Sequence, residues 1–268
     1  LHPSQTDELA RLVSVIREAV APEQILQFGS QAGTTPFGDI PAYDLLIVTE
    51  ERDWSRLYEL FKLKLPNRSR IIPYINFYLL TAADISGRMS AFYRFVCSEG
   101  RVLYSRGRVK EKPCDYERFY VAAYDRYELY MGQAEGFLEA GHRSAESSRW
   151  REAGFHTAYG AEQMLHALYG VYHGADPGIR SLPELFARLR TLSAELWVSL
   201  DPERSGVSRM LGRLEGFRRQ VLYDPGSRAD GKEIGEYLGR VREMGEIVKK
   251  LCGARLRLYR SRIPVAER

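Results

Sequence analysis

The chain has 268 residues, of which 44% are hydrophobic, 12% aromatic and 28% charged, and its formal net charge is +4. These values exclude a mainly disordered chain and are enough for one large core or two smaller ones. No apolar run reaches the roughly 18 residues of a membrane span, and the first residues lack the pattern of a signal peptide. The three cysteines lie too far apart in sequence for a disulfide framework or a zinc site. We therefore expect a soluble cytoplasmic protein.

The first hundred residues mix helix and strand signals. Apolar residues recur at helical spacing from Leu9 to Val20, and Ser4 is a suitable cap for that helix. The continuous apolar run 45–48 is typical of a strand buried on both faces. The patterns predict, in chain order, a helix over 5–20, strands over 25–28 and 45–48, a helix over 54–65, a strand over 71–79, a helix over 82–97 and a strand over 101–104. This order predicts a small mixed-sheet domain over residues 1–110.

From about Asp115 onward the strand signals stop and apolar residues step by three and four. Three long stripes cover residues 119–137, 155–172 and 234–252, and two shorter amphipathic segments cover 182–192 and 208–222. Antiparallel helices with short connections would bury these stripes together. The sequence thus predicts an all-α bundle over residues 111–268, joined to the first domain by a linker over 107–113. The predicted fold class is α+β.

A Gly-Ser pair follows the first predicted strand, in Gln27-Phe28-Gly29-Ser30-Gln31-Ala32-Gly33, and Tyr43-Asp44-Leu45-Leu46-Ile47-Val48 follows after a loop. This order resembles the minimal nucleotidyltransferases of the polymerase-β-like superfamily. The resemblance implies that Gly29 and Ser30 hold a nucleoside triphosphate such as ATP, and that Asp44 is a catalytic residue that binds Mg²⁺. Glycine also lets backbone amides approach a phosphate closely. The alternative, in which Gly29 only satisfies the dihedral angles of a turn, stays open.

The sequence departs from that family where the chemistry takes place. The family pattern has two aspartates at i and i+2 and a third acid on a later strand, whereas here the i position is Ala42 and the strand over 71–80 contains Asn76 but no carboxylate. Asp39 lies too far along the loop to replace them. A single carboxylate does not offset the charge of two magnesium ions. We expect an impaired transferase site with weak or absent Mg²⁺ binding, although Asp44 as a strand-end acid capping a turn is an alternative.

The segment 155–168, with Ala161-Glu162 near its centre, resembles the second helix of HEPN domains, and the Gly-Pro loop and Arg180-Ser181-Leu182 that follow it continue the family's order. The resemblance covers most of residues 115–252 and implies a helical bundle that forms a homodimer. The combination of this resemblance with a nucleotidyltransferase-like first half in one chain is more specific than either resemblance alone. Tyr124 and Leu129 support the dimer independently, because, with Tyr120 and Met131, they lie off the apolar stripe of their helix.

Many HEPN proteins are ribonucleases in which an arginine is followed a few residues later by a histidine. The corresponding stretch here, Arg218-Arg219-Gln220-Val221-Leu222-Tyr223, contains no histidine, so we expect no ribonuclease activity. Arg218 and Arg219 are expected on a solvated helix face, with a phosphate or RNA contact at a dimer cleft as the alternative. His156 and His166 are expected to be hydrogen-bonded residues of the core helix.

The C-terminal end is basic, with six cations and no acid between Glu246 and Glu267: Lys249, Lys250, Arg255, Arg257, Arg260 and Arg262. Such a tail binds RNA by counterion release or simply complements the helix dipole. Taken together, the two resemblances imply a nucleotide-binding nucleotidyltransferase–HEPN fusion of toxin–antitoxin-like organisation, and the missing acids predict an impaired transferase site. Two alternatives stay open. One is an active enzyme that moves a nucleotidyl group to a hydroxyl of a protein, RNA or small molecule, and the other is a toxin-like HEPN protein that cleaves RNA.

Overall fold

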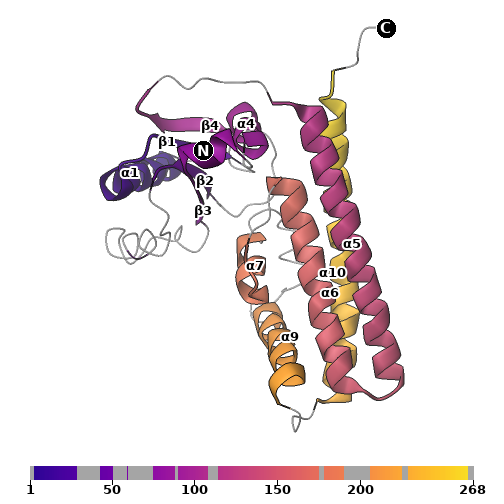
Figure 1. Ribbon diagram of the computed structural model, residues 1–268. Helices are drawn as coiled ribbons and strands as arrows, with labels where there is room; N and C mark the ends of the chain where they lie inside the picture. The colour runs from indigo at the N-terminus through magenta and orange to yellow at the C-terminus, as the bar shows by residue number, and fades with distance from the viewer. Residues whose placement is uncertain are drawn as a thin grey trace. The chain divides into compact units, whose positions relative to one another are not determined.

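The computed structural model describes residues 3–28, 43–50, 59, 75–87, 90–107, 114–174, 178–189, 206–224 and 229–264. The chain forms two compact units, Leu1–Asp115 and Tyr116–Arg268 (Figure 1). Apart from Gly107, the predicted linker lies outside the described residues. Within the described part of the chain, no helix is both long and apolar enough to span a membrane.

A mixed four-stranded sheet forms the centre of the first unit. Its order is β3-β2-β1-β4, with β1 antiparallel to both neighbours and β2 parallel to β3. The elements of this unit are α1 (Pro3–Val20), β1 (Gln24–Phe28), β2 (Tyr43–Val48), β3 (Ile75–Leu80), α3 (Ala82–Ser86), α4 (Ser90–Glu99) and β4 (Arg101–Ser105). The predicted mixed sheet is therefore confirmed.

Alternation along the strands divides this sheet into two apolar faces. On one face, Ile25, Leu45 and Ile47 form a buried cluster with Leu12 and Ile16 of α1. On the other face, Phe28 of β1 lies against Tyr78 of β3 and Phe92 of α4, with ring centroids 5.4 and 5.5 Å away. Both faces of β2 are thus buried, as its continuous apolar run predicted.

Two of the predicted helices differ from the structure in this unit, and two further predicted elements are only partly described. The first helix begins at Pro3, so Ser4 lies inside its first turn rather than at its cap. The predicted helix over 82–97 is two helices, because Thr81 and Asp84 form a capping box for α3 and Gly87 ends it. The predicted strand over 71–79 is described only from Ile75 onward, and the predicted helix over 54–65 lies outside the described residues except for Glu59.

The described elements of the second unit are all helical, which confirms the predicted α+β class. They are α5 (Tyr116–Glu146), α6 (Trp150–His173), α7 (Leu182–Leu189), α9 (Gly206–Tyr223) and α10 (Gly231–Ser261). Helix α6 is central and contacts all four others (Figure 1). Its glycines permit close packing, since a Cβ on Gly160 would lie 2.9 Å from Leu138 of α5 and one on Gly154 would lie 2.9 Å from both Phe217 and Ile234.

The residues predicted to lie on a second apolar face of α5 divide into two groups. Met131 is buried inside the bundle, so its assignment to an outer face was wrong. Tyr124 and Leu129 are exposed by 42% and 55%, and Val121 beside them is exposed by 48%. Tyr120 stacks on Tyr124, with ring centroids 6.0 Å apart. We call Val121, Tyr124 and Leu129, with Tyr120 at their edge, the apolar surface of α5; exposed Asp125 and Glu128 alternate with these side chains.

Candidate functional site

Asp44 is buried near the start of β2, with 2% of its surface exposed. The register places it opposite Phe28 of β1 and beside Asn76 of β3. Because cross-strand partners share a face, Asp44 lies on the side of the sheet that carries the Phe28–Tyr78–Phe92 ring cluster. The acid is therefore held at the end of β1 from which the chain continues into Gly29 and Ser30.

The predicted nucleotide-binding residues Gly29 and Ser30 lie outside the described part of the chain, as do Asp39 and Ala42. For Asn76 only the backbone position in β3 is described. Among the described residues, no group of three or more His, Cys, Asp or Glu side chains is placed to hold a metal ion. Asp44 contributes the one carboxylate among itself and its cross-strand partners Phe28 and Asn76. A pair of magnesium ions requires more anionic groups than that.

Gln27 is a second polar side chain buried at this end of the sheet, and the sequence motif gave it no function. It is fully buried, and neither its Oε1 nor its Nε2 has a hydrogen-bond partner within the described structure. The sequence carries a signal for this residue, because Gln27 is a polar side chain between Leu26 and Phe28 in an otherwise apolar strand segment. Its register partner on β2 is Leu45, so it lies on the face opposite Asp44.

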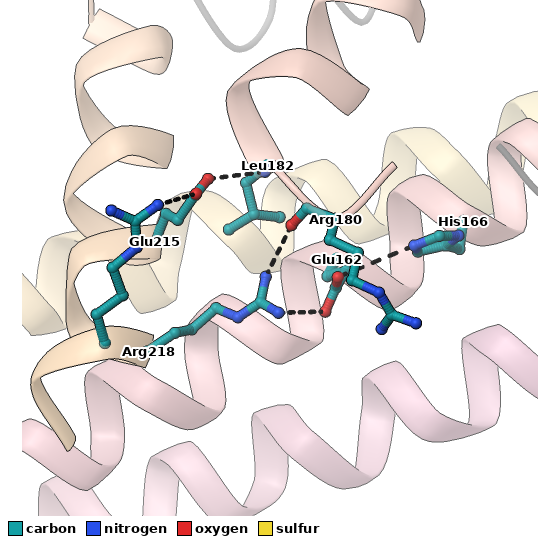
Figure 2. A network of polar contacts seen from close by, with 7 residues as sticks. Glu162, His166, Arg180, Leu182, Glu215 and Arg218 are labelled. Atoms are coloured by element: carbon teal, nitrogen blue, oxygen red, sulfur yellow. Dashed lines mark hydrogen bonds and ion pairs between the residues drawn. The ribbon is translucent and has the colours of Figure 1, made fainter. Parts of the chain in front are cut away.

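In the helical unit, a buried carboxylate connects three segments of the chain. Glu162 of α6 is 7% exposed at its side chain and lies 3.4 Å from Nη2 of Arg218 on α9. Nη1 of Arg218 donates to the carbonyl oxygen of Arg180, 3.3 Å away, in the segment before α7. On the other side of Glu162, Nε2 of His166 lies 4.0 Å from Oε1 (Figure 2). The arrangement fastens α9 and the start of α7 to α6.

Arg218 and Arg219 occupy different environments, although they are adjacent in sequence. The Arg218 side chain is only 15% exposed and its guanidinium lies 4.5 Å from the ring centroid of Tyr159. The prediction of a solvated face was therefore wrong for Arg218, because an acid on α6 and an aromatic ring enclose it. The Arg219 side chain is 77% exposed and pairs with Glu215. The other carboxylate oxygen of Glu215 accepts the backbone N–H of Leu182 (Figure 2).

The two core histidines are packed against aromatic rings. His166 lies 5.4 Å from Tyr130, and His156 lies between Phe137 and Phe155. Burial lowers the pKa of His156, so its imidazole is neutral at pH 7. Its Nδ1 makes no hydrogen bond within the described structure, which differs from the hydrogen-bonded state expected from sequence.

The basic C-terminal segment is less uniform than its sequence indicates. Arg255 is buried, its Nε donates to the hydroxyl of Tyr259, and its guanidinium lies 5.4 Å from the ring centroid of Tyr172. Lys249 is paired with Glu135 and Glu246. The exposed cations of the segment are therefore Lys250, Arg257, Arg260 and Arg262.

Comparison with known proteins identifies the helical unit. The family model of the HEPN domain matches residues 127–251. We refer to this matched segment as the HEPN domain. Glu162, Arg218 and the central helix α6 all lie inside it, so the network around Glu162 belongs to the HEPN domain itself. The predicted HEPN resemblance is thereby confirmed.

A solved structure also resembles the chain over most of its length. It is the crystal structure of a nucleotidyltransferase-like protein from Exiguobacterium sibiricum, with 15% sequence identity and a TM-score of 0.33. The match covers 96% of this chain and 81% of that chain. The search of curated proteins gave no match. The HEPN match agrees with the second half of the predicted order.

Proposed function

We propose that this protein is a nucleotidyltransferase–HEPN fusion that binds a nucleoside triphosphate such as ATP and has an impaired transferase site. The observation that carries the proposal is the register of β1 and β2, in which Asp44 lies opposite Phe28. Phe28 directly precedes Gly29 and Ser30 in the sequence, so the acid and the candidate phosphate-binding pair belong to the same end of two neighbouring strands.

The residues that pair with Asp44 on the neighbouring strands favour binding of a nucleotide over its transfer. The neighbour of Asp44 on β3 is Asn76, which offers a neutral amide in place of a carboxylate. A nucleotidyl transfer needs several anionic oxygens to hold magnesium against the triphosphate, whereas binding of the triphosphate alone needs backbone and hydroxyl donors. Gly29 and Ser30 supply donors of the second kind.

A thermal-shift experiment tests nucleotide binding. Millimolar ATP with Mg²⁺ is expected to raise the melting temperature of the wild-type protein, because a ligand that binds only the folded state stabilises it by mass action. Gly29→Val is expected to abolish the shift, since a side chain there blocks the close approach of phosphate. Gly107→Val is the matched control, because a Cβ at Gly107 meets no atom within 4 Å. An unchanged melting curve with ATP contradicts the proposal.

A transfer assay tests the impairment separately. With Asp44 as the remaining acid of the motif, transfer of labelled AMP to protein, RNA or small acceptors is expected at background. Ala42→Asp together with Asn76→Asp restores the family's carboxylates and is expected to raise the transfer above that background. Robust transfer by the unmodified protein favours the active nucleotidyltransferase instead.

The proposal includes a homodimer formed through the HEPN domain. The apolar surface of Val121, Tyr124 and Leu129 supports it, since a second copy would remove these side chains from water. It also includes RNA as a partner of the exposed cations near the end of α10, among them Arg257 and Arg260. Binding there would weaken steeply with salt, because phosphate contacts release counterions.

A further inference from the structure

A cavity of about 550 Å³ lies between α5 and α10 in the HEPN domain. Its floor is apolar and consists of Met131 and Leu138 from α5, Met164 from α6 and the backbone of Gly245 from α10. The glycine keeps the space open, because a Cβ at Gly245 would lie 2.7 Å from the Met164 methyl group. Glu162 is two residues before Met164 and therefore lies on the opposite side of α6, so this cavity is separate from the Glu162–Arg218 network.

The rim of the cavity is charged, and acids outnumber cations. Two glutamates come from α5 and two from α10, while one arginine and one lysine of α10 oppose them. The charged rim residues are Glu135, Glu139, Glu243, Glu246, Arg242 and Lys249. His142 also lines the rim. An apolar floor below an acidic rim favours a ligand with an apolar body and a positive end.

Lys249 already shows how this rim binds an ammonium group. Its Nζ lies 3.0 Å from Oε1 of Glu135 on α5 and 3.3 Å from Oε1 of Glu246 on α10, so carboxylates from both helices hold it. Glu139 pairs with Arg143 at 2.7 Å. Glu243 is exposed and forms no ion pair with any described residue, which leaves one carboxylate of the rim available to a ligand.

We propose that this cavity binds a small organic cation, with its apolar body on the Met131–Leu138–Met164 floor and its ammonium group at Glu243. The volume is within the range of small-molecule sites, roughly 300–1,000 Å³, and is too small for a partner helix. Burial of the apolar body supplies most of the affinity, and the acidic rim selects the sign of the charge. A carboxylate ligand of the same length would instead meet four glutamates, with Arg242 as the rim cation outside the Lys249 pairs.

Methionine methyl resonances report on this site directly. In protein labelled with ¹³C at the methionine methyl groups, n-octylammonium is expected to shift the Met131 and Met164 signals in a saturable way. Met210, which is buried and does not line the cavity, serves as the internal reference. Octanoate of equal chain length is expected to bind at least tenfold more weakly. Equal shifts with both probes, equal shifts at Met210, or no saturable shift at millimolar probe would each overturn the proposal.

Charge reversal on α10 locates the ammonium group. Glu243→Lys is expected to weaken n-octylammonium binding at least tenfold, whereas Glu236→Lys, the same change at an exposed position outside the cavity, is expected to leave it unchanged. Both residues are exposed, so both variants are expected to melt as the wild type does. Equal weakening by the two substitutions would show a general effect of net charge and would overturn the assignment to Glu243.

Discussion

Arg218 of α9 and Glu162 of α6 form an ion pair whose two side chains are 15% and 7% exposed, 56 positions apart in sequence. The guanidinium also bonds to the carbonyl of Arg180 and lies over the ring of Tyr159. A buried pair of this kind contributes little net stability, but loss of one partner leaves a buried charge without compensation. Its main consequence is to fix how α9 packs against α6.

Removal of Arg218 tests that consequence. Arg218→Ala is expected to lower the free energy of unfolding by about 3 kcal/mol, because Glu162 then stays buried without its cation. Arg219→Ala is the control, since the Arg219 side chain is 77% exposed, and a loss below about 1 kcal/mol is expected. Urea denaturation followed by circular dichroism measures both. Equal losses for the two variants would refute the buried pair.

Gly174 ends α6 in a left-handed conformation, with φ of 63°, and a Cβ there would lie 2.6 Å from Cζ of Phe119. Gly174→Ala therefore combines backbone strain with displacement of Phe119, and a loss of about 3 kcal/mol is expected. Gly178 has a φ of 65° but no atom within 4 Å of its Cβ position. Gly178→Ala isolates the strain and is expected to cost about 1 kcal/mol. Indistinguishable denaturation midpoints would show that Phe119 does not resist the added methyl.

Glu233 makes the stability of the HEPN domain depend on pH. Arg213 donates to both of its carboxylate oxygens, at 3.0 and 2.8 Å, and this bonding lowers the pKa of Glu233 below its ordinary value. A depressed folded-state pKa contributes stability above the ordinary carboxyl pKa of about 4.5, and the contribution is lost as pH falls through the folded value. The wild type is thus expected to lose more stability than Glu233→Gln on acidification from pH 5 to 3.

Glu236→Gln is the control for that measurement, because Glu236 is exposed on the same helix. Its unfolding free energy is expected to follow the wild type at every pH. The Glu233 assignment fails when the Glu233→Gln and wild-type curves run parallel through the acid range.

The apolar surface of α5 gives the proposed dimer a direct test. Tyr124→Arg places a charge among these exposed apolar side chains and is expected to shift the protein from a dimer to the 30.7 kDa monomer. Light scattering at micromolar concentration measures the mass. Val102→Arg, at a residue 41% exposed on β4, is expected to leave the dimer intact. A wild-type protein that is already monomeric contradicts the proposal.

Local patterns predicted the elements well and the contacts between distant residues poorly. The apolar run of β2 and the stripes of α5, α6 and α10 identified those elements, because burial on one or both faces leaves a period in the sequence. Met131 and Arg218 were assigned to solvent or to a partner, because their burial depends on α6, which packs against them from elsewhere in the chain. The position of Asp44 in its strand followed from the motif, but its register with Phe28 depends on how the strands pair.

The strand order β3-β2-β1-β4 has a consequence for synthesis on the ribosome. β1 is an inner strand that pairs with β4, so one of its edges lacks its native partner until residues 101–105 have emerged. The other edge pairs with β2 much earlier. The α5–α6 hairpin, by contrast, joins helices of 31 and 24 residues through residues 147–149, and such local contacts form quickly. The unit made first therefore depends on the slower, non-local pairing, and its nascent β1 edge is open to association with other chains until β4 covers it.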